Sequence, residues 1–163
     1  MGSKHFAAHP TIPRKEIVAN INLDMFLPII PLKAITVYGM DESDLGSDFA
    51  GIASKFNVAT KRDPQPARNL FIRSDQYSFV RRGIPSLAFK FHAEKGTAED
   101  EVMANWLRQR YHAPSDDLQQ PVEMEHAVQF NRVMTVFIEH TANRSARPRW
   151  NESSFFRRYV TSD

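Results

Sequence analysis

Three short runs of apolar residues, separated by stretches with helical periodicity, constrain the fold of this chain more than any other feature. The runs cover residues 17–23, 35–38 and 86–91, and their β-branched or alternating apolar side chains are typical of strands. Strands and helices therefore alternate along the chain. This order favours an α/β domain with a layered sheet and flanking helices. We expect residues 17–23 to form a central strand.

The intervening stretches carry helix signals. Ser74 and Thr97 are candidate N-caps, and Pro121 is placed to open the longest helix. Helices are predicted, in chain order, at residues 3–8, 41–56, 75–80, 97–110 and 121–142. The predicted core face of the last helix consists of Val122, His126, Phe130, Val133, Phe137 and Ile138.

Composition indicates an ordinary globular protein of 163 residues, 42% hydrophobic and 25% charged. We expect one α/β domain over residues 1–142, followed by an Arg-rich tail over residues 143–163. No apolar run approaches the ~20 residues of a membrane span, and no signal-peptide pattern opens the chain, so no membrane partner is expected. The net charge of +2 gives no strong field for nucleic acid. The chain has no cysteine, which excludes disulfides and thiolate ligands.

Two segments carry candidate metal ligands. Asp24 ends the first predicted strand, in Asn20-Ile21-Asn22-Leu23-Asp24-Met25, and His112 lies on a loop after a helix, in Tyr111-His112-Ala113-Pro114-Ser115-Asp116-Asp117. A carboxylate and an imidazole both suit zinc, but zinc normally takes three or four protein ligands. Read from these residues alone, Asp24 is more simply an ordinary cap or turn residue after a strand, and His112 an exposed loop side chain.

Both segments resemble the zinc aminopeptidases of peptidase family M28, which are exopeptidases with two zinc ions. The resemblance implies that Asp24 is a ligand of one zinc ion and His112 a ligand of the other. Between them, the family has a Ser-Asp-His-x-x-Phe-x-x-x-Gly-Ile-Pro motif, which this chain matches from Ser74 to Pro85 except that Gln76 replaces the histidine. The resemblance covers roughly residues 2–142 and implies a larger mixed sheet.

The rest of the family's site has no counterpart in these residues. Family members carry an upstream His-x-Asp pair, a bridging ligand and a Glu-Glu pair that contains the general base. This chain contains neither a His-x-Asp nor a Glu-Glu sequence. We therefore expect the C-terminal part, or a truncated relative, of such an enzyme, with little peptidase activity alone. The alternative is a non-catalytic binding or oligomerising module with the same fold.

Further residues have two readings each. Asp75 and Asp116 either stabilise their own turns or support the site. Phe26, Phe71 and Tyr77 either line a substrate pocket or pack in the core. Arginines that could bind a substrate carboxylate, or be solvated, are Arg81, Arg82, Arg108 and Arg110. We expect a homo-oligomer, because missing strands would leave a sheet edge and an apolar face uncovered. Nucleic-acid binding by the tail is a third, weaker alternative.

Overall fold

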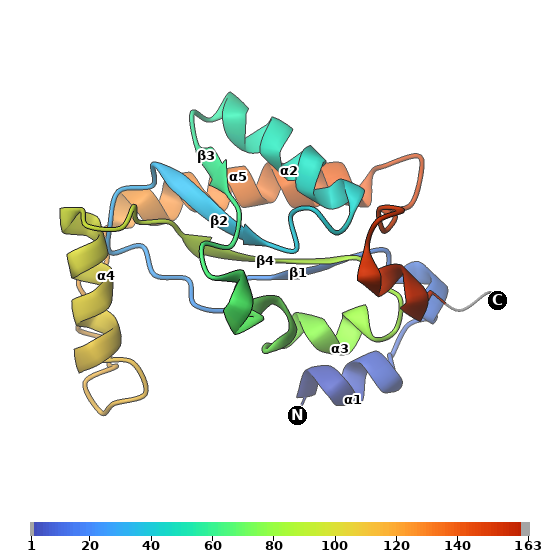
Figure 1. The fold of residues 1–163 in the computed structure, drawn as a ribbon, viewed down its shortest axis with the longest axis horizontal. Helices are drawn as coiled ribbons and strands as arrows, with labels where there is room; N and C mark the ends of the chain where they lie inside the picture. Colours follow the sequence, from blue (N-terminus) through green and yellow to red (C-terminus); the bar gives the residue numbers. More distant parts are fainter. Residues whose placement is uncertain (1, 161–163) are drawn as a thin grey trace.

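The computed structural model describes residues 2–160 and contains a four-stranded mixed sheet (Figure 1). The strands are β1 (Asn20–Asn22), β2 (Ala34–Tyr38), β3 (Ala59–Lys61) and β4 (Ser86–Phe91), and they lie in the order β1-β4-β2-β3. β1 runs parallel to β4, β4 runs antiparallel to β2, and β2 runs parallel to β3. Parallel and antiparallel pairs in one sheet with flanking helices confirm the predicted α/β class.

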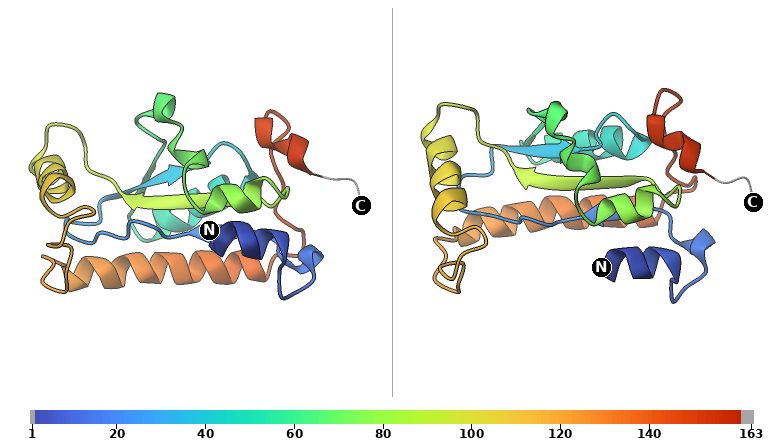
Figure 2. Two further views of the ribbon diagram at one scale, coloured as in Figure 1. Left: turned by 90° about the horizontal axis from the view of Figure 1, so that it is seen from below. Right: turned by 60° about the horizontal axis from the view of Figure 1, so that its bottom comes forward.

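One face of the sheet is covered by two helices, α2 (Asp44–Lys55) and α5 (Met124–Ala142). Figure 2 shows α5 running along the sheet as an outer layer. Side chains alternate across a strand, so Ile35 and Val37 of β2 point into the core that these helices close. At its centre, the ring of Phe49 lies 4.6 Å from Phe89 and 5.1 Å from Phe137. These aromatic contacts fix both helices against the sheet.

The opposite face of the sheet carries the alternate, mostly polar side chains, including Thr36, Tyr38 and Lys90. Short helical segments cover this face only in part. They are α1 (Gly2–Ala8), the 3-10 turns η2 (Pro66–Arg68) and η3 (Leu70–Ile72), and α3 (Gln76–Val80). α3 contacts β1, β4 and α1, so it lies between the sheet and the N-terminal helix (Figure 1). This partly covered polar face is where a binding site can form.

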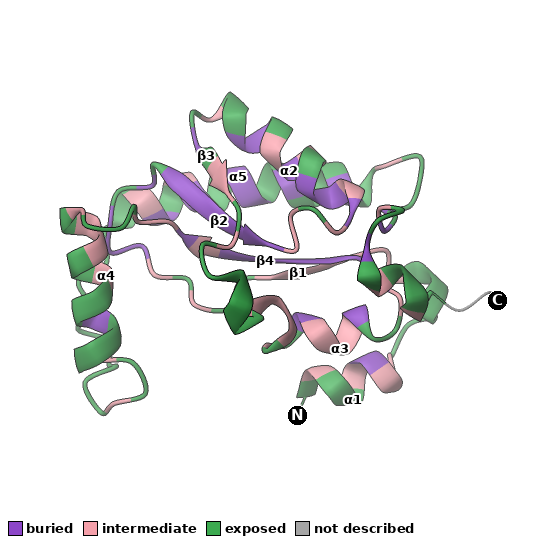
Figure 3. Cartoon of the chain, in the orientation of Figure 1, coloured by how far each residue is buried: buried purple, intermediate pink, exposed green. Residues whose placement is uncertain are grey.

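Helix α4 (Ala98–Gln109) stands apart at the end of the molecule remote from both termini (Figure 1). The hydroxyl of Thr97 accepts a hydrogen bond from the amide of Asp100, which confirms Thr97 as the N-cap. Most of α4 is exposed, and Trp106 is its buried residue (Figure 3).

The first strand differs from the prediction. β1 is only three residues long and lies at an edge of the described sheet, where it pairs with β4 alone. The expectation of a central strand was wrong because the run is not continuously apolar. Asn20 and Asn22 alternate with Ile21, which is the pattern of a strand buried on one face.

The last helix also begins later than predicted. Glu123 donates its backbone N–H to the carbonyl of Pro28, and the helix starts at Met124 rather than at Pro121. Val122 therefore lies outside it and is exposed, and Ile138 faces solvent on the outer side. Phe130, Val133 and Phe137 are buried as expected, so the predicted face was right at its centre only.

The described part of the tail, residues 143–160, packs against the rest of the domain. Trp150 is buried, forms an isolated antiparallel bridge with Ser43, and donates its indole N–H to the carbonyl of Gly83 at 2.9 Å. Arg144 forms ion pairs with Asp44 at 2.7 Å and Asp48 at 2.9 Å. Two further 3-10 turns, η1 (Arg14–Glu16) and η4 (Phe155–Tyr159), lie at the end of the molecule opposite α4 (Figure 1). Within the described range, no helix is long and apolar enough to cross a bilayer.

Candidate functional site

Asp24 lies two residues beyond β1, where the backbone turns sharply. The amide of Asp24 donates to the side-chain oxygen of Asn22 at 3.2 Å, and Met25 adopts a left-handed conformation with φ of 62°. One carboxylate oxygen of Asp24 accepts a hydrogen bond from the hydroxyl of Ser74 at 2.9 Å. The sequence predicted Ser74 as the cap of α3, but its hydroxyl is used on Asp24 instead, and α3 has no side-chain cap bond. The side chain of Asp24 is thus exposed to solvent, and the hydrogen bond from Ser74 fixes its orientation.

Gln76 connects the Ser-Asp-Gln segment to β1. Its side chain is 1% exposed, accepts a hydrogen bond from the amide of Asn22 at 2.6 Å, and donates to the carbonyl of Phe71 at 2.6 Å. A neutral histidine also offers one donor and one acceptor, so glutamine supplies the same pair of bonds as the histidine of the resembling family. Gln76 is therefore a positioning residue for the strand that carries Asp24.

The carboxylate of Asp24 interacts electrostatically with Lys90 on the polar face of the sheet. Burial lowers the pKa of Lys90, and the negative charge of Asp24 opposes that effect. The ammonium of Lys90 lies 5.7 Å from the centre of the Tyr38 ring. Burial, assisted by the charge of Asp63, raises the pKa of Tyr38 to about 12, so its phenol stays protonated at neutral pH. This face therefore combines a carboxylate, an ammonium and a neutral phenol.

His112 lies on the loop that follows α4, again in a left-handed conformation, with φ of 57°. Its ring stacks on Tyr111 with 3.9 Å between centroids, and both residues are exposed. Two backbone bonds close the loop around it: Ala113 donates to the carbonyl of Arg110, and Asp116 donates to the carbonyl of Ala113. The imidazole is therefore presented to solvent by a structured turn.

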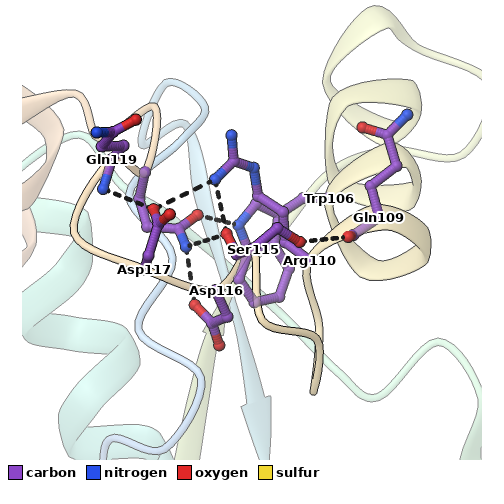
Figure 4. Close-up of polar contacts among 8 residues, drawn as sticks. Trp106, Gln109, Arg110, Ser115, Asp116, Asp117 and Gln119 are labelled. Carbon is purple, nitrogen blue, oxygen red and sulfur yellow. Dashed lines mark hydrogen bonds and ion pairs between the residues drawn. The ribbon is translucent and has the colours of Figure 1, made fainter.

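Side chains hold this loop against α4 (Figure 4). The guanidinium of Arg110 donates to the carbonyl of Ser115 at 2.8 Å and lies 3.8 Å from the carboxylate of Asp117. Gln120 accepts a bond from the indole N–H of Trp106 at 2.7 Å and donates to Asp116 at 2.8 Å. Asp116 thus accepts a hydrogen bond within its own loop, and Arg110 is occupied there too.

Asp75 and the other candidate arginines have contacts other than Asp24. Asp75 precedes α3 and accepts a hydrogen bond from Ser3 of α1 at 2.6 Å. Arg81 and Arg82 follow α3 and are exposed, and Arg108 is exposed on α4 beside Asn105. A role for any of them in binding substrate stays a prediction.

Two of the three aromatic residues predicted for a pocket lie in the same hollow. Phe71 and Tyr77 line a cavity of about 670 Å³ beside the end of β2, whereas Phe26 packs against Phe91 and Phe130 on the other face of the sheet. The cavity is completed by residues that sequence reasoning did not assign to a pocket, namely Phe155, Phe156 and Tyr159. The clustering of these aromatic residues in the sequence was the available signal, but only the fold shows that they lie beside Phe71 and Tyr77.

Between residues 2 and 160, neither a hydrogen bond nor an ion pair joins Asp24 to His112, and no group of three or more carboxylate or imidazole side chains is placed to hold a metal ion. The two residues remain the predicted ligands. Each has an exposed side chain whose chemistry suits zinc.

The family model of peptidase family M28 matches residues 1–138. The chain belongs to peptidase family M28. It is thereby related to metallopeptidases, which are hydrolases. The chain matches no curated protein and no solved structure. The part of this M28 chain beyond residue 138, which includes the tail, lies outside the match.

The M28 family is generally zinc-dependent. Carboxylate oxygen and imidazole nitrogen are both ordinary zinc ligands, but a site normally has three or more protein ligands. Among residues 2–160 no such group exists. The described residues therefore do not form a complete zinc site by themselves.

Proposed function

We propose that this chain supplies one part of an M28 zinc aminopeptidase site, with Asp24 and His112 as ligands. The proposal rests on the hydrogen bonds that hold Asp24 and its strand. Ser74, in the Ser-Asp motif shared with the family, donates to the Asp24 carboxylate, and Gln76 of the same motif accepts a hydrogen bond from Asn22 of β1. The incomplete ligand set supports the idea that the remaining ligands and the general base come from residues other than these 163.

In the complete site, zinc would activate a water molecule and polarise the scissile carbonyl. The residues of this chain would orient the ligands. Ser74 holds one oxygen of Asp24, which leaves the other oxygen free to bind, and Gln76 fixes the end of β1 from which the carboxylate projects. Such outer partners fix the ligand geometry.

The apolar hollow next to this region is the proposed seat of the substrate's N-terminal side chain. Its wall residue Phe71 accepts the bond from Gln76, so two hydrogen bonds in series connect the hollow to Asn22 and the strand of Asp24. A cavity of about 670 Å³ lies within the ~300–1,000 Å³ range of small-ligand pockets. We therefore propose a preference for large apolar N-terminal residues in the complete enzyme.

Zinc titration tests the ligand assignment directly. We expect weak zinc binding, measured by competition with a chromophoric chelator, that falls about tenfold or more in Asp24→Asn and in His112→Ala, the scale seen when supporting partners of metal sites are removed. Matched controls are Glu125→Gln and His140→Ala on α5, which remove the same kinds of donor elsewhere. Equal losses in the controls would contradict the assignment.

Release of a chromophore from leucyl and other aminoacyl anilides tests activity. We expect no appreciable turnover from this chain with added zinc, because general acid–base catalysis alone is typically worth ~10²–10⁴-fold and the family's base is absent from these residues. Robust turnover that survives both ligand substitutions would overturn the proposed site.

The coding sequence upstream of residue 1 should contain a His-x-Asp and a Glu-Glu motif if the proposal is right.

The outer face of α5 favours a second function, self-association. Met124, Val128 and Ile138 lie on one side of this helix and are 69%, 45% and 45% exposed; together with Asn131 and Thr135, which lie between them, they form a stripe that is apolar at both ends and polar at its centre. We propose that this stripe pairs with its counterpart on a second copy of the chain. Light scattering at micromolar concentration should show a dimer in the wild type and a monomer in Val128→Asp, and a wild-type monomer would contradict the idea.

A further inference from the structure

A second hollow lies at the end of the molecule opposite α4. It is a groove of about 1370 Å³ between three segments that are distant in sequence. These are residues 10–18 before β1, residues 82–85 before β4, and residues 145–160 of the tail, and both figures of the ribbon show them gathered at one end (Figures 1 and 2). Because β1 and β4 are parallel, this groove lies where both strands begin, whereas Asp24 lies beyond the end of β1.

The groove is strongly basic. Six cations line it against a single carboxylate, that of Glu152. The cations are Arg14, Lys15, Arg82, Arg147, Arg149 and Arg157, and all six are exposed. The whole chain has a net charge of only +2, so positive charge is concentrated here and the remainder is net acidic. Within residues 2–160, none of the six forms an ion pair with a carboxylate.

One of these cations builds the groove. The guanidinium of Arg147 donates to the backbone carbonyls of Lys15 and Ile17, which joins the tail to the segment before β1. Carbonyl partners do not neutralise its charge, so Arg147 adds to the positive potential while it fixes the groove's shape. The family match ends at residue 138, so the wall made by the tail is not part of the region shared with the family.

Beneath the charged rim, the groove has an apolar floor. Ile17, Val18, Ile84 and Pro85 contribute aliphatic surface, and Ile84 and Pro85 are buried. Trp150 is the one aromatic residue of the lining, but it is 7% exposed and its indole N–H is occupied by the carbonyl of Gly83. The floor therefore offers aliphatic contacts without an exposed ring.

This combination discriminates between polyanions. Proteins that bind single-stranded nucleic acid stack bases on exposed aromatic side chains, and this lining presents none. The groove also exceeds the ~300–1,000 Å³ of small-ligand pockets. An extended polypeptide with alternating acidic and aliphatic side chains places carboxylates against the rim and aliphatic groups on the floor.

We propose that the groove between residues 10–18, 82–85 and 145–160 binds an acidic, extended polypeptide segment. This binding is separate from the proposed peptidase site and does not depend on zinc. Electrostatic complementarity makes the association salt-dependent, since the Debye length falls to about 8 Å at physiological ionic strength.

The test uses the wild-type chain and a fluorescein-labelled ten-residue peptide of alternating glutamate and leucine, with anisotropy as the readout. We expect saturable binding at low salt that weakens as salt is added. Replacing every glutamate of the peptide by glutamine should weaken binding about tenfold or more. A ten-nucleotide thymidine oligonucleotide should bind more weakly than the acidic peptide under the same conditions.

Paired variants locate the binding. Arg82→Gln with Arg157→Gln removes two rim cations, and we expect about tenfold weaker peptide binding, because each close charge pair contributes modestly and two are lost. The matched control is Arg81→Gln with Arg158→Gln, which removes two neighbouring arginines outside the lining and should leave the affinity within about twofold.

Three results would overturn the proposal. These are equal binding of the glutamate and glutamine peptides, tighter binding of the oligonucleotide than of the acidic peptide, and equal losses in the two double variants. The first two of these comparisons use only the wild-type chain, so they remain decisive even if a variant fails to fold. Circular dichroism would reveal such a failure.

Discussion

The two segments that carry the predicted ligands are stabilised in different ways. Asp24 lies two residues beyond β1. The last residue of this strand, Asn22, is hydrogen-bonded to the buried side-chain amide of Gln76. His112 projects from an exposed loop that is tied to the end of α4 by polar side chains, and only Trp106 beneath it is buried. One predicted ligand is thus positioned by the core of the domain and the other by a surface network.

This difference has a consequence for how each segment responds to change. A buried polar group that loses its partner costs about 1–3 kcal/mol, whereas an exposed one recovers much of its bonding from water. Substitutions near Asp24 should therefore reduce global stability, and substitutions in the His112 loop should mainly increase local motion.

The largest effect is expected for Gln76→Leu. It leaves the amide of Asn22 and the carbonyl of Phe71 without their partner, so the free energy of unfolding should fall by about 2–4 kcal/mol. Urea denaturation measures this change. Gln76→His should stay within about 1 kcal/mol of the wild type, because histidine can supply both bonds. The control Gln119→Leu, on the exposed loop, should change stability by less than about 0.5 kcal/mol. Equal effects at positions 76 and 119 would remove the contrast between the two regions.

A smaller effect is expected for Gln120→Leu, which leaves the buried indole N–H of Trp106 unpaired and frees Asp116. Stability should fall by about 1–2 kcal/mol. Amide hydrogen exchange should accelerate over residues 111–118 more than in the sheet. Gln109→Leu is the control, since the side chain of Gln109 is exposed and only its backbone carbonyl is used. Uniform acceleration across the chain would show that the loop is not an independent unit.

The smallest effect concerns the charge of Asp24. Burial lowers the pKa of Lys90 and the carboxylate of Asp24 opposes this, so Asp24→Asn should lower the pKa of Lys90 further. NMR titration of the Lys90 side chain measures it. Asp116→Asn, in the His112 loop, should leave the Lys90 pKa unchanged. An equal shift from both substitutions would mean that Lys90 does not distinguish the two regions.

The same lowered pKa sets the sign of a pH dependence. Between the folded pKa of Lys90 and the 10.5 of an unperturbed lysine, the unfolded chain binds more protons than the folded one. Stability should therefore rise with pH across this alkaline window, and Lys90→Met should reduce that rise in thermal denaturation series. A fall in stability attributable to Lys90 over the same window would contradict the assignment.

Sequence reasoning located the elements that short-range patterns define. The strand at residues 86–91 follows from alternation, and α4 follows from the Thr97 cap, because both signals lie within the segment itself. The two ligand candidates were visible as motifs. β3 was missed because three residues, Ala59 to Lys61, carry too little periodicity. The role of Gln76 was missed because its partners lie 54 residues upstream and 5 residues upstream, and only the fold identifies them.

The bonds from Arg147 to the carbonyls of Lys15 and Ile17 span 132 and 130 positions of the chain. Contacts between such distant residues form late, because a long loop must close before they contribute. During synthesis, the segment before β1 cannot be anchored in this way until the tail has been synthesised. The groove wall formed by Lys15 and Ile17 is therefore fixed only after Arg147 is present, whereas the pairing of β1 with β4 requires no residue beyond Ala88.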